Sequence, residues 1–396
     1  MKRKWLKCGI WVLAALFALM NIVAAFHAYK FTRFTDCKSE RTKDPKSLKV
    51  GEKVSALIFG VSNPRPKTKA VPASNYQTVK LKSNKEIECW SIKVENPQGT
   101  VILFHGFSDE KSSLLGRADV FRELGFNTFL VDFMGSGGSE GNQTTVGFWE
   151  AMQVKTCFDH LTENGEDNIY LFGSSMGAVA IMKAISDYGV TPKGIIIECP
   201  FGSMYQTVCA RFRTMNVPAF PMAGLLTFWG GLQNGFWAFA HNPADYAKKI
   251  TCPTLLLYGA KDEKVSRRET NAIFNNLGGE KRLKLFQEAG HEDYLEKCRE
   301  EWVHDIRQFL TPTSVVSSSS TSPDFTENTI LLAYDETEGG EKRKVITDAV
   351  IDAMAREESR ACVLAIDAKL AGRDKEYAES PKRQSALQRL NETPES

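Results

Sequence analysis

The sequence has little net charge, few histidines and no cysteine spacing typical of metal sites. Its 50 Lys and Arg residues nearly balance 48 Asp and Glu residues, so the formal net charge is only +2. A chain without a basic excess gives no compositional support for nucleic-acid binding. The nine cysteines are an odd number without a CxxC pair, and several lie within apolar runs. We therefore interpret most of them as small buried apolar residues.

Motifs for metal ions and phosphate groups are also missing. His291-Glu292 begins like the HExxH zinc motif, but Leu295 stands where that motif requires its second histidine. The glycine-rich segment 135–141 has neither the G-x-G-x-x-G spacing of dinucleotide sites nor the Lys-Ser/Thr of a P-loop. The sequence therefore implies neither a metal nor a cofactor.

The amino terminus combines a cationic segment with a long apolar run. Basic residues within 1–7 precede a run from Gly9 to Tyr29 that contains no charged residue, about the length a helix needs to cross a bilayer core. Three interpretations compete: a retained membrane anchor, a secretory signal cleaved near Val23-Ala24-Ala25, and a buried helix. The run is longer than a usual signal core and no clean A-x-A site closes it, so we favour the anchor. The basic residues are denser before the span, which favours an amino end inside and the remaining chain outside.

Composition divides the rest of the chain. The segment 38–74 is rich in Lys, Pro and Ser and is interpreted as a spacer after an anchor or signal segment at 1–37. A main domain is expected at 75–310, followed by a Ser-rich linker at 311–325. The remaining 326–396 carries no catalytic signature and is expected to be a helical or disordered appendage.

Strand-like and helix-like segments alternate in the main domain, which predicts an α/β fold with a mostly parallel eight-stranded sheet and helices on both faces. The predicted strands are Gln77–Lys82, Ile87–Val94, Thr100–Phe104, Thr128–Asp132, Asn168–Phe172, Gly194–Glu198, Pro253–Tyr258 and Arg282–Phe286. The predicted helices lie near Ser112–Leu124, Gly147–Asn164, Ala178–Tyr188, Arg267–Leu277 and Asp293–Leu310. The first two strands follow each other without a helix, so we expect an antiparallel pair at that edge.

The segment 202–246 interrupts this alternation with many aromatic and aliphatic residues. We expect a helical cap over one end of the sheet. One interpretation is that these residues pack against each other and the sheet; the other is that some of them line a pocket for an acyl or other apolar group.

The pentapeptide Gly173-Ser174-Ser175-Met176-Gly177 lies between a predicted strand and a predicted helix. A side chain on so sharp a turn needs glycine two residues away on each side, because a Cβ there would collide with the neighbouring backbone. The G-x-S-x-G spacing therefore selects Ser175 as the candidate nucleophile of a serine hydrolase.

A serine nucleophile needs a histidine to accept its proton and a carboxylate to orient that histidine. His291 follows the last predicted strand, and the carboxyl ends of such strands are where parallel sheets place their chemistry. The other histidines lie in the apolar run, in helices, in the cap or in a separate motif: His27, His105, His160, His241 and His304.

Asp262 follows the penultimate predicted strand, which gives the chain order Ser, Asp, His. Glu263 and Glu198 are alternatives for the acid, although surface or cap contacts are their more ordinary roles. The developing oxyanion also requires N–H donors. We expect them from the backbone of Met176 and of Phe107, with His105 orienting the loop of Phe107.

These motifs together resemble the α/β-hydrolase superfamily, in its branch of serine-aminopeptidase-like and monoacylglycerol-lipase-like hydrolases. The resemblance covers about 76–310 and rests on the following segments in the family's order: His105-Gly106, 131–139, 173–177, 259–262 and Gly290-His291. It implies the α/β-hydrolase fold with a helical cap insertion. The family commonly has Arg at the position of Met134, so any role of that Arg is absent here.

The leading hypothesis is a membrane-anchored hydrolase of carboxylic esters, acting on a small-molecule or lipid-like acyl substrate through an acyl-enzyme intermediate. A peptidase, amidase or acyltransferase with the same triad is the near alternative, because relatives of this fold differ in substrate. A non-catalytic membrane-tethered scaffold is the alternative of another class.

Overall fold

The computed structural model describes residues 2–35, 49, 51–52, 55, 59–311 and 384. The predicted linker beyond Thr311 and the predicted appendage at 326–396, apart from Gln384, lie outside the described residues, as does most of the spacer before Phe59.

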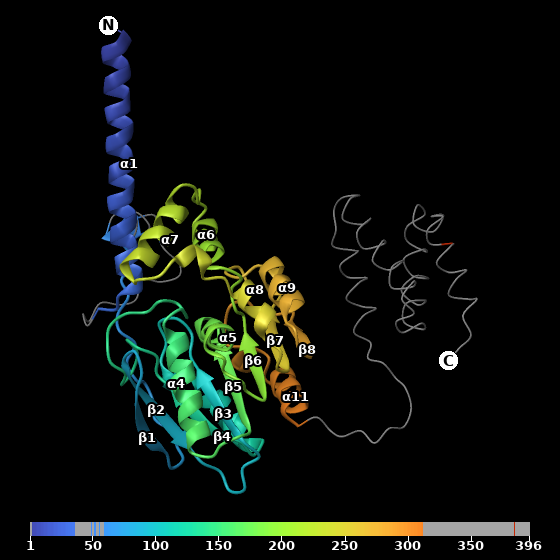
Figure 1. The fold of residues 1–396 in the computed structure, drawn as a ribbon. Coiled ribbons are helices and arrows are strands. Elements are labelled where there is room, and N and C mark those ends of the chain that lie inside the picture. Colours follow the sequence, from blue (N-terminus) through green and yellow to red (C-terminus); the bar gives the residue numbers. More distant parts are fainter. Residues whose placement is uncertain are drawn as a thin grey trace. The chain divides into compact units, whose positions relative to one another are not determined.

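Eight strands form one sheet in the order β1-β2-β4-β3-β5-β6-β7-β8 (Figure 1). Strands β3 to β8 pair in parallel, whereas β2 pairs antiparallel with both β1 and β4. The strands are β1 (Gln77–Lys82), β2 (Glu86–Ile92), β3 (Thr100–Phe104), β4 (Asn127–Val131), β5 (Ile169–Ser174), β6 (Gly194–Glu198), β7 (Thr254–Gly259) and β8 (Lys281–Phe286). The predicted fold class and its antiparallel edge are confirmed.

The central strands are buried along their whole length because helices cover both faces of the sheet. Every residue of β3, β4, β6 and β7 is buried, as expected for the continuous apolar runs of a parallel sheet. One face packs against α4 (Glu150–Glu163), α5 (Met176–Tyr188) and α9 (Arg267–Asn276). The other packs against η1 (Lys111–Leu114), α3 (Leu115–Glu123) and α11 (Arg299–Leu310).

The single helix predicted over Asp293–Leu310 is wrong, because the chain divides into α10 (Tyr294–Lys297) and α11. Cys298 separates the two with a non-helical φ of −136° and ψ of 52°. The break lets each short helix bury its own aromatic anchor. Tyr294 accepts a hydrogen bond from Gly259 N at 2.9 Å, and Trp302 is fully buried beneath α11.

The segment after β6 forms the helical cap. It contains α6 (Met204–Thr214), α7 (Met222–Gln233), η2 (Ala238–Ala240) and α8 (Pro243–Tyr246), with η3 (Ala247–Lys249) leading back to β7. His241 anchors its base, since its ring bonds to Tyr246 Oη at 2.9 Å and Val146 O at 3.0 Å. Burial lowers the pKa of His241 to about 4, so this ring is neutral and structural.

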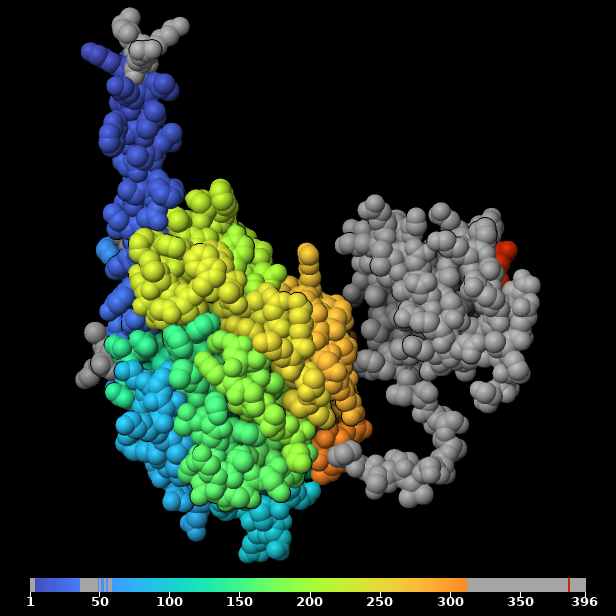
Figure 2. Space-filling view, in the orientation of Figure 1, coloured from blue at the N-terminus to red at the C-terminus, as the bar shows by residue number. Residues whose placement is uncertain are grey.

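Helix α1 (Lys2–Thr32) carries the apolar amino-terminal run and packs its second half against α7. Three hydrogen bonds join the two segments: Trp229 Nε1 donates to Asn21 Oδ1 at 3.1 Å, Gln233 Nε2 to Ala25 O at 2.9 Å, and Arg33 Nη1 to Asn234 Oδ1 at 2.6 Å. Residues 4–19 are exposed and pass beyond the cap (Figure 2). Within the described chain, α1 is the one helix long and apolar enough to cross a membrane.

Candidate active site

Ser175 stands on a strained turn between β5 and α5. Its φ of 49° and ψ of −106° lie outside the regions that ordinary residues favour. A Cβ on Gly173 would lie 2.6 Å from Ala178 N, and one on Gly177 would collide with the carbonyl of Phe104. The two glycines therefore supply the space that this elbow requires, which is the steric reason for the G-x-S-x-G spacing.

The structure brings Ser175, His291 and Asp262 into one hydrogen-bonded chain. His291 Nε2 lies 3.1 Å from Ser175 Oγ, and His291 Nδ1 lies 2.8 Å from Asp262 Oδ2. The second oxygen of Asp262 accepts from the backbone N–H groups of Lys264 and Val265, at 2.8 and 2.9 Å. These two bonds fix the carboxylate, so its free oxygen holds the imidazole with Nδ1–H toward Asp262 and Nε2 toward the serine.

The alternative acid Glu198 is committed elsewhere. Its carboxylate, fully buried at the end of β6, bonds to Arg117 Nη2 at 2.8 Å and to Trp302 Nε1 at 2.7 Å. Arg117 also pairs with Asp293 at 2.7 Å, so this cluster ties β6 to α3, α10 and α11. Glu263 has an exposed side chain at the surface. Of the three acids weighed, Asp262 is the one bonded to His291.

The loop of Phe107 lies beside the elbow, where an oxyanion would form. A Cβ on Gly106 would come within 3.9 Å of Ser175 Cβ. His105 is fully buried, its Nδ1 lies 2.8 Å from Gly106 O, and its Nε2 accepts from Phe133 N at 3.0 Å. Because Nε2 acts as an acceptor, this ring orients the loop rather than exchanging protons with a substrate.

A buried ion pair supports the same loop region. Lys111 is fully buried and pairs with Asp132, and its Nζ also lies 2.9 Å from Glu88. Asp132 accepts from Gly138 N at 2.9 Å. The glycine-rich segment after β4 is therefore folded around a carboxylate of the protein itself.

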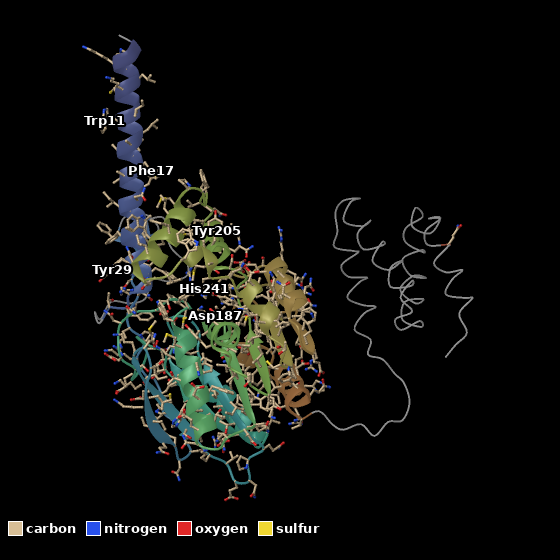
Figure 3. The ribbon with its side chains drawn as sticks, in the orientation of Figure 1. Trp11, Phe17, Tyr29, Asp187, Tyr205 and His241 are labelled. Atoms are coloured by element: carbon tan, nitrogen blue, oxygen red, sulfur yellow. The ribbon has the colours of Figure 1, made fainter. Side chains whose placement is uncertain are left out.

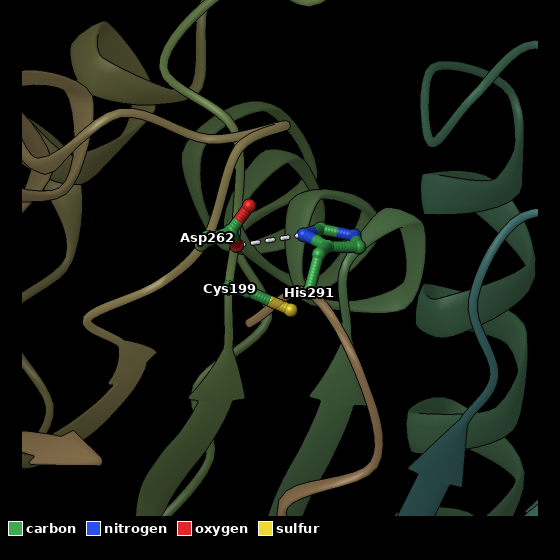
Figure 4. Close-up of side chains that lie close together, drawn as sticks. All are labelled: Cys199, Asp262 and His291. Carbon is green, nitrogen blue, oxygen red and sulfur yellow. Dashed lines mark hydrogen bonds and ion pairs between the residues drawn. The ribbon is translucent and has the colours of Figure 1, made fainter. Parts of the chain in front are cut away.

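Cys199 is a neighbour of the three candidate residues that sequence reasoning missed. It directly follows β6 with a φ of 40°, and its side chain is buried beside His291 and Asp262 (Figure 4). The sulfur, an imidazole nitrogen and a carboxylate oxygen of these residues lie within 4.8 Å of one another. Thiolate, imidazole and carboxylate also bind zinc, but a metal held there would compete for the groups that join His291 to Asp262.

This environment changes the proton affinity of His291. Burial lowers the pKa of His291, but the Cys199 sulfur and the Asp262 carboxylate raise it by more, so that the pKa lies above its ordinary value. Only the neutral imidazole accepts a proton from Ser175.

We therefore expect kcat/KM to rise with pH through a midpoint above 6.5, the ordinary pKa of histidine. Cys199→Ala removes one of the two groups that favour the imidazolium, so the midpoint should move to lower pH. Cys157→Ala is the matched control, because Cys157 is fully buried in α4. Hydrolysis of a short-chain aryl ester from the acid to the alkaline range measures both midpoints, because the pKa of His291 is raised to about 10. An unchanged midpoint in Cys199→Ala would exclude the effect of its sulfur.

An apolar cavity of about 360 Å³ lies between the cap, the second half of α1 and the loop of Thr145 and Val146. Part of the cap lines it, including Phe212, Met222 and Phe236. Other apolar side chains of the cap face outward: Phe220 is 85% exposed and Trp237 is 60% exposed. The predicted cap residues thus divide between lining a cavity and facing the surroundings.

The wall of this cavity reaches the elbow region. Thr145 and Val146 lie in it, and the adjacent Thr144 Oγ1 is 3.3 Å from the sulfur of Met176, the residue after Ser175. On the other side, Phe31 lines the cavity and stacks on Phe107, with ring centroids 4.7 Å apart and planes 6° from parallel. Met176 and Phe107 are not themselves among the described residues that line the cavity, but Phe107 contacts a residue of its wall and Met176 contacts the neighbour of one.

Known proteins match both the sequence and the fold. A family model described as "Serine aminopeptidase, S33" matches residues 95–228, a range that includes the elbow and Phe107 but not Asp262 or His291. The structure of an esterase from Pyrococcus furiosus is similar with a TM-score of 0.53 and 20% identity, over 63% of this chain and 99% of that one. The chain has the α/β-hydrolase fold, and its sequence resembles this superfamily.

The matches to two curated relatives extend over most of the length of those relatives. The uncharacterized protein YqkD of Bacillus subtilis is 24% identical over 57% of this chain and 75% of its own. A carboxylesterase of Bacillus subtilis is 25% identical over 53% of this chain and 91% of its own. These matches support a hydrolase of the α/β-hydrolase fold.

Proposed function

We propose that this α/β-hydrolase cleaves carboxylic esters through Ser175, His291 and Asp262. The observation that carries the proposal is the unbroken hydrogen-bonded chain from Ser175 Oγ through the imidazole to Asp262 at a strained elbow. Ser175 Oγ attacks the ester carbonyl carbon while His291 Nε2 takes the hydroxyl proton. Asp262 stabilises the imidazolium and keeps its orientation.

The remaining steps use the same groups. The tetrahedral intermediate carries its negative charge on the former carbonyl oxygen, facing the N–H groups of Met176 and Phe107. When the ester C–O bond breaks, His291 gives its proton to the leaving alcohol, and the acyl group stays on Ser175. Water then attacks the acyl-enzyme, gives a proton to His291, and the acid leaves as Ser175 regains its proton.

The description of the matching family model favours a second candidate, an aminopeptidase. Such an enzyme must hold the free ammonium group of its substrate, and a desolvated ammonium needs a carboxylate partner. The described residues that line the cavity include no Asp or Glu. The cavity therefore favours an apolar acyl group over an aminoacyl group.

We further propose that α1 is retained as a membrane anchor. Cleavage near Val23-Ala24-Ala25 would remove Asn21, which accepts a hydrogen bond from the indole of Trp229, and would cut beside the carbonyl that Gln233 contacts. Ala24 is fully buried against the rest of the protein. These contacts support a helix that stays with the mature enzyme.

One experiment tests both proposals on the full chain. Membranes containing the protein are washed with carbonate and treated with a fluorophosphonate probe, and the adduct is mapped by mass spectrometry. We expect one adduct, on Ser175, in a pelleted protein that keeps residues 1–25. Faster turnover of a butyrate aryl ester than of aminoacyl anilides separates esterase from peptidase.

Two outcomes would contradict these proposals separately. A folded protein that the probe does not label excludes the serine hydrolase and supports the non-catalytic scaffold. Release into the carbonate supernatant, or an amino terminus beginning after Ala25, excludes the anchor while leaving the esterase proposal intact.

A further inference from the structure

The cavity is built jointly by the amino-terminal helix and the cap. Val23, Ala28 and Phe31, on successive turns of α1, contribute to its wall together with α6 and α7. A helix that served only to tether the domain would need no part in a cavity beside the active site.

We propose that α1 forms part of the acyl-binding site and that the substrates are long-chain acyl esters resident in the membrane. This inference rests on the proposed esterase function and names its substrate class. The cavity volume of about 360 Å³ is in the range of small-molecule sites. Its wall is mostly apolar, which suits a hydrocarbon chain; Arg211 also lines it, but its described residues include no carboxylate that could pair with an ammonium group.

The packing of α1 explains how a membrane helix reaches the chemistry. Ala24 and Ala28 are four residues apart, so they lie on the same face of α1, and both are buried. Such small side chains allow α7 to approach closely. One turn further, Phe31 stacks on Phe107, and the guanidinium of Arg211 from α6 lies 4.5 Å from the centre of the Phe31 ring.

Helix α7 connects this cavity to a lipid-facing surface. Met222, Leu226 and Gly230 line the cavity, whereas Phe228 and Leu232 of the same helix are 36% and 57% exposed. The exposed side chains continue toward Trp237, whose ring centroid lies 6.3 Å from that of Phe228.

Exposed aromatic and aliphatic side chains beside a membrane helix are typical of segments that lie in the bilayer interface. In α1 itself, Trp11, Phe17 and Tyr29 are exposed, and Tyr29 is the one of these that lies near the cap (Figure 3). Tyr205, on the cap, is exposed as well. The same two elements, α1 and α7, therefore face lipid on one side and the cavity on the other. A membrane-resident ester lies next to the wall of the site that receives its acyl chain.

The test fills the cavity from the α1 side. Ala28→Trp places an indole at a buried wall position, and Ile22→Trp is the matched control, because Ile22 is on α1 but 67% exposed. The full-length variants are compared in detergent micelles on p-nitrophenyl palmitate and p-nitrophenyl butyrate. The readouts are the palmitate-to-butyrate ratio of kcat/KM and the rate of labelling by a small fluorophosphonate.

We expect Ala28→Trp to lower the palmitate-to-butyrate ratio by a factor on the order of 10 to 100, the scale by which a hydrophobic pocket discriminates chain length. Ile22→Trp should leave the ratio at the wild-type value. If Ala28→Trp is labelled at the wild-type rate and keeps the wild-type ratio, α1 is not part of the acyl site.

A second variant keeps the inference testable if Ala28→Trp does not fold. Val23→Phe adds a smaller volume at a half-buried wall position. It should lower the same ratio, and an unchanged ratio in a labelled Val23→Phe protein overturns the inference. A wild-type protein that hydrolyses neither ester and is not labelled contradicts the proposed function instead, so the two failures are distinguishable.

Discussion

Replacing Ser175 by Ala should lower kcat/KM for a short-chain aryl ester by a factor on the order of 10⁶ and abolish fluorophosphonate labelling. The substitution removes Oγ, which lies 3.1 Å from His291 Nε2 and is the atom that would carry the acyl group in the acyl-enzyme. Alanine fits wherever serine does, and the glycines on either side are unchanged. The melting temperature should therefore stay close to that of the wild type.

Ser174→Ala is the matched control for this measurement. Ser174 is the last residue of β5, directly before the nucleophile, and is half-buried like Ser175. Its change should leave kcat/KM within about tenfold, because the spacing of the glycines selects the following serine. A folded Ser175→Ala protein that keeps more than a small fraction of its turnover would contradict the assignment, as would an adduct that moves to Ser174.

Local patterns predicted the fold, and they also selected the three residues of the proposed triad, because each of these depends on short stretches of sequence. The strands are continuous apolar runs, and the elbow needs two glycines within five residues. Asp262 and His291 were each selected as residues that follow a predicted strand, and the structure brings them together because β7 and β8 are neighbours in the sheet.

Features that depend on distant contacts could not be predicted. Cys199 is one buried cysteine among several in apolar runs, and only the packing of β6 beside β7 places its sulfur near His291. The contact of α1 with the cap joins residues about two hundred positions apart, such as Asn21 and Trp229. The hydropathy of α1 predicts only a membrane-spanning helix. It gives no indication that α1 also forms part of the proposed acyl-binding site.

Asp262→Asn should lower kcat by a factor on the order of 10⁴ while the geometry stays close to that of the wild type. In the wild type, one carboxylate oxygen accepts from two backbone N–H groups and the other accepts from His291. An asparagine keeps its carbonyl oxygen toward the two N–H donors, because its NH₂ group there would oppose them. The NH₂ group then faces Nδ1, which must become an acceptor.

That change moves the imidazole proton to Nε2, the nitrogen that has to accept the proton of Ser175, so the base is in the wrong tautomer. Glu263→Gln is the neighbouring control, since its exposed side chain lies outside the bonded chain, and it should change kcat less than about threefold. Steady-state kinetics and fluorophosphonate labelling rates of both variants decide the matter. If Asp262→Asn retains near wild-type turnover while Glu263→Gln loses it, the acid of this site is Glu263, because loss of catalysis then follows the neighbouring carboxylate.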